Sequence, residues 1–242
     1  MTPESRTDVR LDLAEKGRAP DGSPTTLDRR LFMQLNAFTG CENVAPLTRA
    51  LDEAGLDGVL YESAHDPRGV ALLTFAENPA HLVDTVRPFL ATSAFSRLEW
   101  QPSFAMLGRT YSIGYEADLA DALVHRPRSR VKDPSYDWAV WYPLRRSGAF
   151  ERLSADEQRA ALMEHGGIGR RFGAAGHAHD IRLACHGLDI QDNDFVIGLV
   201  GPQLHPLSTV VQAMRRTVQT SVYVERMGPF FVGRAVWRGT RS

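Results

Sequence analysis

The sequence predicts an α+β fold in which two ferredoxin-like β-α-β-β-α-β units join as one dimeric α+β barrel. Two observations predict this duplication. The order of strand-like and helix-like segments in residues 28–125 recurs in residues 135–239, and a short stretch of similar residues recurs as well. The segment ENPAHLVDTV at 77–86 is similar to GPQLHPLSTVV at 201–211. An unrelated pair of α+β domains is the alternative that this element order leaves open.

The first unit contains six expected elements. Gly55 suits the left-handed C-cap of the first helix, and the turn HDPRG separates the two middle strands. The expected strands are 30–38, 58–63, 69–76 and 104–115, and the expected helices are 43–55 and 82–90.

The second unit repeats that order. One helix begins at a capping box, with Ser154 as the N-cap and Glu157 three residues later, and is expected to end near His165. The apolar face of the other expected helix runs from Leu207 to Val218. The expected strands are 137–144, 179–186, 194–201 and 229–237.

Residues 1–27 are expected to form a polar N-terminal tail, and the basic segment 126–134 is expected to link the halves. The formal net charge is -1, which predicts no nucleic-acid partner. Without a signal-peptide core or an apolar run long enough for a bilayer, we expect a cytoplasmic protein with no membrane contact. The two isolated cysteines indicate neither a zinc site nor a disulfide framework.

The stretch MEHGGIGRRF (163–172) holds the first candidate site. His165 has small residues one turn earlier on its helix face, and three glycines follow it within four positions, which leaves volume around the imidazole. A helix C-terminus also favours a cation or metal nearby. From the residues alone, His165 is either a structural core histidine or a metal ligand.

Two further candidates lie on strands. His177 and His179 have a spacing common among metal ligands, but without a partner at a recognisable spacing a polar strand entrance is favoured. Tyr142 precedes Arg145 and Arg146. It is either a core tyrosine or a redox-active or proton-donating group beside a cofactor, with the arginines ready for carboxylates.

Several motifs together resemble the chlorite dismutase superfamily, which includes the coproheme decarboxylases of bacterial haem synthesis. The resemblance covers about residues 136–238, in the family order and at nearly the family spacing, whereas the first half matches only in element order. It implies a duplicated α+β barrel that assembles as a homopentamer. The motifs are YPL (142–144), LMEHGGIGRRF (162–172), HGLD (186–189), DFV (194–196) and GPFFVG (228–233).

The resemblance implies a haem cofactor, either haem b or coproheme III, with His165 as the ligand of its iron. It implies Tyr142 as the catalytic tyrosine. In the decarboxylases a tyrosyl radical takes hydrogen from a haem propionate, hydrogen peroxide is the oxidant, and carbon dioxide leaves to form a vinyl group. Ser221 maps to a serine that contacts a propionate. Arg146 replaces a propionate-binding lysine, which keeps the charge but changes the geometry.

The departures from the family concern the other face of the haem. The distal position above the iron falls on Asp180, where chlorite dismutases place an arginine and many decarboxylases a glutamine. Arg182 has the same strand parity and could face the haem instead. The preceding segment is about two residues longer than in the family, so His177 or His179 could also reach over the iron.

Two further departures concern the proximal side and the basic turn. Gln219 aligns with the glutamate that hydrogen-bonds the proximal histidine. A neutral amide would give the imidazole less anionic character and weaken electron donation to the iron. The family's W-Y-x-L-P is reduced to AFERL at 149–153.

The expected function is therefore the peroxide-dependent oxidative decarboxylation of coproheme to haem b. One alternative is a haem b enzyme repurposed for a small nitrogen- or oxygen-containing substrate in specialised metabolism. Another is a haem-binding protein without turnover. A true chlorite dismutase is least favoured, because Asp180 stands where that activity places an arginine. The expected partners are a small-molecule substrate, hydrogen peroxide and further copies of the chain.

Overall fold

The computed structural model of the chain describes residues 11–239, so positions 1–10 of the expected tail lie outside the described residues. Each half contains the six expected elements in the expected order. In the first half these are β3 (Phe32–Thr39), α1 (Ala45–Ala54), β4 (Gly58–Ser63), β5 (Val70–Ala76), a π-helical turn (Leu82–Val86) that continues into α2 (Arg87–Thr92), and β7 (Met106–Thr110).

The second half has the same order and additional short elements. Its elements are β8 (Trp138–Arg146), α4 (Gly148–Glu151), α5 (Ala155–Ala174), β9 (His179–Ala184), β10 (Phe195–Gly201), α6 (Leu204–Met214), α7 (Val218–Tyr223), β11 (Val224–Met227) and β12 (Phe231–Arg238). The short strand β6 (Glu99–Trp100) pairs with β3, and β11 pairs with β8.

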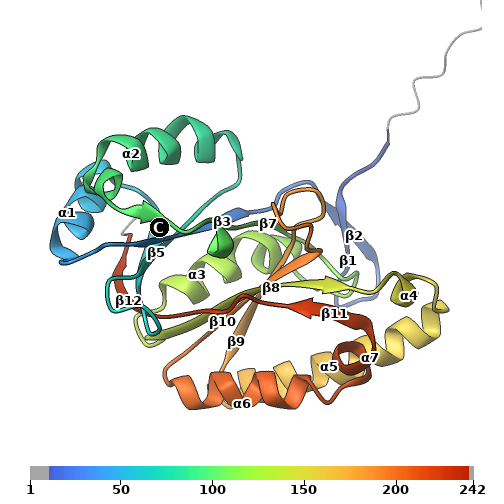
Figure 1. Ribbon diagram of the computed structural model, residues 1–242. Helices are drawn as coiled ribbons and strands as arrows, with labels where there is room; N and C mark the ends of the chain where they lie inside the picture. Colours follow the sequence, from blue (N-terminus) through green and yellow to red (C-terminus); the bar gives the residue numbers. More distant parts are fainter. Residues whose placement is uncertain (1–10, 240–242) are drawn as a thin grey trace, which may run out of the picture.

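Within residues 11–239, eight antiparallel strands close into a barrel (Figure 1). Their order is β10-β9-β7-β3-β5-β4-β12-β8, and β8 returns to β10. The halves meet at two seams, where Arg109 of β7 lies opposite Ala184 of β9 and Tyr61 of β4 lies opposite Ala235 of β12. The predicted α+β barrel of two ferredoxin-like units is confirmed.

The inward-facing side chains fill the barrel. Trp141 of β8 is fully buried there and lies opposite Gly198 of β10. A Cβ atom on Gly198 would lie 2.5 Å from the indole ring, so this position accepts only glycine while the tryptophan occupies the centre. Because the barrel is packed with side chains, a cofactor must lie outside it.

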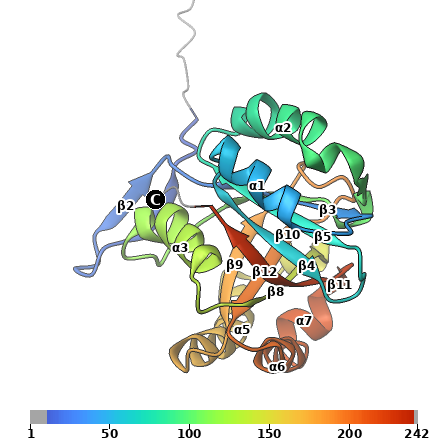
Figure 2. The ribbon, with the colours of Figure 1, turned by 90° about the vertical axis from the view of Figure 1, so that its left-hand side faces the viewer.

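The helices cover opposite outer faces of the barrel (Figure 2). Helices α1 and α2 pack on the first half, and α5, α6 and α7 lie on the second. Helix α1 ends as predicted at Gly55, whose φ is 58°. In the second half, the outward side chains of the sheet and the helices that cover them therefore form a layer of their own, outside the barrel core.

Two segments outside the repeats have structure that the sequence did not predict. Part of the expected tail forms a hairpin of β1 (Glu15–Arg18) and β2 (Pro24–Leu27). The Glu15 carboxylate accepts hydrogen bonds from Arg109 and from the Ser112 backbone N–H. The basic joining segment is mostly helical, as α3 (Arg126–Lys132).

The expectation that a helix ends near His165 is wrong. Helix α5 begins at the predicted capping box of Ser154 and Glu157 but continues through the glycines to Ala174. His165 is therefore in the middle of a 20-residue helix, where the C-terminus of that helix does not lie beside it to favour a cation. None of the helices in the described part of the chain is both long and apolar enough to cross a membrane.

Candidate haem site

Strands β8, β10 and β9 of the second half are neighbours, and their outward side chains point toward the layer that contains α5. On this face Arg182 of β9 lies opposite Ile197 of β10, which lies opposite Tyr142 of β8. Asp180 is two residues before Arg182 on the same side of its strand, while Ile181 between them points into the barrel core. The topology thus brings three predicted site residues onto one surface.

His165 reaches this layer from α5. Its Nδ1 atom lies 3.2 Å from Thr217 Oγ1 and 3.4 Å from Thr220 Oγ1, at the contact between α5 and α7. No hydrogen bond engages its Nε2 among the described residues. Burial lowers the pKa of His165; Asp180 opposes this shift, and Arg182 reinforces it. A neutral imidazole with one anchored and one unengaged nitrogen is what an iron ligand requires.

Close packing does not require the glycines that follow His165 in α5. A Cβ atom added at Gly166, Gly169 or Gly173 would make only ordinary van der Waals contacts, the nearest at 3.5–3.6 Å. Each glycine inside a helix is roughly 1 kcal/mol less favourable than alanine. Since packing does not require these glycines, their presence fits a flat group lying against the helix.

Asp180 and Arg182 form a charge cluster with the joining helix. Arg182 Nε lies 3.2 Å from Asp180 Oδ2. Arg130 of α3 donates a hydrogen bond to the Asp180 carbonyl at 2.8 Å, and its guanidinium lies 3.7 Å from the carboxylate. Glu116 lies 4.0 Å from Arg182 on the other side. Sequence reasoning missed Arg130, because it lies 50 residues from its partner in a segment expected only to link the halves.

Tyr142 is buried at 3% exposure, and its ring stacks on Phe230 with 4.5 Å between centroids. Burial raises the pKa of its phenol; Asp180 adds to the shift, and Arg215 opposes it. The hydroxyl makes no hydrogen bond within residues 11–239. Tyr142 is therefore a protonated phenol whose oxygen is available in the layer that contains His165.

The two predicted propionate contacts are already engaged by protein groups. Arg146 donates a hydrogen bond to Glu151 at 2.7 Å and lies over the rings of Phe150 and Phe195. The Ser221 hydroxyl donates to the Thr217 carbonyl at 2.8 Å, although its oxygen can still accept. Of the two, Arg146 is the more firmly held.

Gln219 does not take the place of the family's glutamate. Threonine hydroxyls contact His165 instead, and the Gln219 side-chain oxygen is buried without a hydrogen-bond partner. Thr217 and Thr220 were missed by sequence reasoning, since their contact depends on how α7 packs against α5. A threonine at the N-cap of α7 and another inside that helix carried no signal for a histidine more than 50 residues away.

His177 and His179 do not form a site together. His177 is exposed before β9, whereas His179 is half-buried and its ring centroid lies 5.0 Å from that of Tyr136. Burial and the nearby Arg130 lower the pKa of His179. Across the described chain, no group of three or more His, Cys, Asp and Glu side chains is placed to hold a metal ion. An iron here would need the porphyrin as well as His165.

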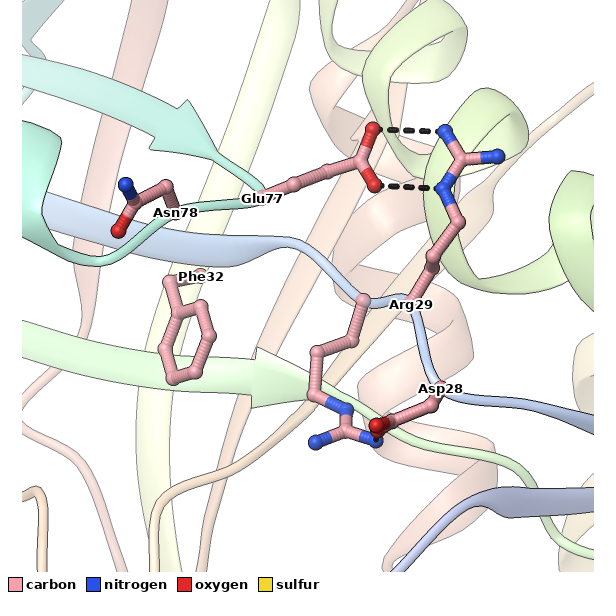
Figure 3. A pocket seen from close by; sticks show the side chains of 6 residues that line it. Asp28, Arg29, Phe32, Glu77 and Asn78 are labelled. Carbon is pink, nitrogen blue, oxygen red and sulfur yellow. Dashed lines mark hydrogen bonds and ion pairs between the residues drawn. The ribbon is translucent and has the colours of Figure 1, made fainter.

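Two surface clefts are lined mainly by charged residues. The larger, about 550 Å³, is at the end of β8 and is lined by Arg145, Arg146 and His186 together with acidic residues. The smaller, about 290 Å³, is in the first half (Figure 3). There Arg29 and Glu77 are joined by two hydrogen bonds, so the charged groups of this cleft satisfy each other.

Comparison with known proteins identifies the family. The family model described as chlorite dismutase matches residues 59–236. A haem-binding protein from Thermus thermophilus has a TM-score of 0.67 at 20% identity, over 86% of this chain and 91% of that one. Two mutants of the chlorite dismutase from Candidatus Nitrospira defluvii, one of them in complex with cyanide, have TM-scores of 0.65 and 0.66 at 14% and 15% identity, each over 86% of this chain and 92% of that one. Among curated proteins no match is found.

The structural likenesses, all at low identity, show the fold. The family model extends over most of the chain and across both halves of the barrel, including His165, Tyr142 and Arg182. The chain belongs to the chlorite dismutase family.

Proposed function

We propose that the chain binds haem through His165 and is a haem-dependent oxidoreductase, with the oxidative decarboxylation of coproheme by peroxide as its reaction. The observation that carries the proposal is the shared layer of His165 and Tyr142. In the described part of the chain, His165 on the helix has a ring nitrogen without a hydrogen bond, and Tyr142 on the sheet facing it has a phenol without one. A bound haem would supply an iron that peroxide can oxidise.

The environment of Tyr142 suits a hydrogen-atom carrier. The phenol is protonated at neutral pH and burial raises its pKa further, so oxidation of the side chain must release a proton together with the electron. The stacked Phe230 ring holds the tyrosine ring in one orientation, and the nearby Arg215 brings positive charge. These features support Tyr142 as the group that takes hydrogen from a carboxylated side chain.

The decisive experiment adds hydrogen peroxide to the purified protein loaded with coproheme. We expect haem b to form through a three-propionate intermediate, and Tyr142→Phe to abolish its formation. Tyr136→Phe is the matched control, because the Tyr136 ring contacts His179 and has no part in the proposed reaction. Bleaching of coproheme without product, or full activity in Tyr142→Phe, would contradict the proposal.

A specific observation favours a second candidate, a haem b enzyme for a small nitrogen- or oxygen-containing substrate. Arg146 and Ser221 already bind protein groups, which leaves fewer free partners for the four carboxylates of coproheme than for the two of haem b. This candidate predicts that haem b remains bound through purification and that a small substrate perturbs its Soret band. Retention of haem without any oxidant-dependent product would instead indicate a binding protein without turnover.

We also propose assembly as a homopentamer. Met163 on α5 and Val222 on α7 are each 61% exposed, and these helices pack against each other. Exposed apolar side chains on adjacent helices are typical of an interface. Light scattering of the purified protein tests the oligomer size, and a monomer would contradict the proposal.

A further inference from the structure

Among the described residues, no carboxylate forms a hydrogen bond or ion pair with His165 where α5 packs against α7. His165 Nδ1 has two neighbours, the hydroxyl oxygens of Thr217 and Thr220 at 3.2 and 3.4 Å, which lie 3.4 Å from each other. Both threonines are buried, at 2% and 9% exposure. The nearby Glu164 carboxylate is turned toward the start of α7, where it accepts the Val218 N–H at 2.9 Å.

The proton of the Thr217 hydroxyl is committed elsewhere. Thr217 Oγ1 donates to the Met214 carbonyl at 2.7 Å, the shortest of its hydrogen bonds. A hydroxyl has one proton, so toward His165 this oxygen can only accept. The 3.2 Å contact is therefore a hydrogen bond only if His165 Nδ1 carries a hydrogen, which leaves the lone pair on Nε2.

We propose that Thr217 Oγ1, paired with the more distant Thr220 Oγ1, is the acceptor for the Nδ1–H of His165. The pair holds the imidazole as the neutral Nδ1–H tautomer and sets the reduction potential of the bound haem iron above the value that a carboxylate acceptor would give. The first part concerns the chain alone. The second rests on the haem binding proposed above.

The physical reason is the charge that the acceptor lends to the imidazole. A carboxylate attracts the Nδ1 proton and makes the ring a stronger electron donor, which stabilises ferric iron. Neutral hydroxyls attract that proton less, so the ring donates less electron density to the iron. The reduction potential is therefore higher than with a carboxylate acceptor. Thr217 and Thr220 are thus positioning residues that act through His165.

The tautomer can be measured without haem. Long-range ¹H–¹⁵N correlation spectra of the apo protein report which ring nitrogen of His165 is protonated, with His165→Gln identifying its signals. We expect protonation at Nδ1. Protonation at Nε2 would overturn the inference, whatever the protein binds.

The reduction potential is measured by spectroelectrochemistry of the haem-loaded protein. Thr220→Asp places a carboxylate where the hydroxyl now lies, and we expect at least a tenfold shift toward ferric iron, equal to about 59 mV for one electron. Thr220→Val removes one acceptor and should raise the potential, while Thr220→Ser should restore the wild-type value.

Gln219→Glu is the contrasting variant, because Gln219 makes no hydrogen bond to His165 in the described structure. Its shift should be smaller than that of Thr220→Asp, and a larger one would overturn the inference. If Thr220→Asp does not fold, Thr220→Val provides the test, and an unchanged or lower reduction potential in that variant would overturn the inference. Failure to bind haem at all would refute the proposed function, and the tautomer measurement would still decide the proton assignment.

Discussion

The Asp180 carboxylate and the Arg182 guanidinium lie 3.2 Å apart on the outer face of β9. The position that the family resemblance assigns to the group above the iron therefore holds a carboxylate that is already paired with a cation. Arg130 approaches the same carboxylate from α3 at 3.7 Å. Of the two cations beside Asp180, Arg182 is the more exposed, at 40% against 27% for Arg130, and is therefore the better placed to meet an anion on this surface.

The first prediction follows from this pair. In the haem-loaded protein, Arg182→Gln should weaken fluoride binding by about tenfold, which corresponds to about 1.4 kcal/mol. Asp180→Asn should strengthen it, because a competing negative charge is lost. Titrations followed by absorption spectra measure both affinities. Changes of the same sign in the two variants would show that Arg182 does not act as the cation of this site.

The second prediction concerns His165 as the haem ligand. His165→Gln should weaken haem binding on the order of 100-fold or more, since even the partners of a metal-binding histidine contribute about 10–100-fold. His177→Gln is the control, because His177 is exposed outside the layer. Haem titration followed at the Soret band measures both. Equal affinity in His165→Gln and wild type would rule out His165 as the ligand.

The third prediction tests the start of α5. The Ser154 hydroxyl accepts the Glu157 backbone N–H, and the Glu157 side chain accepts the Ser154 N–H in return. Ser154→Ala should lower the free energy of unfolding by about 1 kcal/mol. Ser208→Ala, at an exposed position inside α6, should leave it nearly unchanged. Urea unfolding of the apo protein provides the comparison, and equal stability of the two variants would contradict the role of the cap.

The fourth prediction concerns Gln219, whose buried side-chain oxygen has no hydrogen-bond partner within residues 11–239. Leaving such an acceptor unpaired costs about 1–3 kcal/mol. Gln219→Met, which removes it at similar volume, should raise the free energy of unfolding of the apo protein by about 1 kcal/mol. Gln212→Met at an exposed position of α6 is the matched control. A loss of stability in Gln219→Met would show that the amide has a partner in solution.

The fifth prediction is a pH dependence caused by Cys185. Burial raises the pKa of its thiol to about 12, with Asp189 and Asp194 adding to the shift, against an ordinary value of 9.0. Below pH 9 the thiol is protonated in both states and stability does not depend on it. Between pH 9 and 12 only the unfolded chain loses this proton, so the free energy of unfolding falls as pH rises. Cys185→Ala should show a shallower fall in urea unfolding series, and an identical slope would contradict the assignment.

Much of the architecture was predictable from the sequence, because strand alternation and helix caps are local properties. Gly55 and the Ser154 capping box mark helix ends through their own backbone and side-chain chemistry, and both were predicted correctly. Strand parity likewise places Asp180 and Arg182 on one face of β9. The motif around His165 was recognisable for a similar reason, since its residues are consecutive along one helix.

The errors arose where packing overrides local preference. Glycines after His165 predicted the end of a helix, yet α5 continues through them, because contacts with β9, α6 and α7 stabilise the helix beyond its intrinsic propensity. The hairpin at 15–27 escaped prediction because its polar strands are held by distant groups such as Arg109.

The sequence by itself determined the order of the elements, the duplication and the histidine that faces the outer layer of the second half. Only the tertiary structure decided which groups surround that histidine. The hydroxyl oxygens of Thr217 and Thr220 reach His165 across more than 50 positions of chain, and Arg130 reaches Asp180 across 50. Such contacts depend on how helices pack on a closed barrel, and the pattern of residues along the chain does not specify that packing.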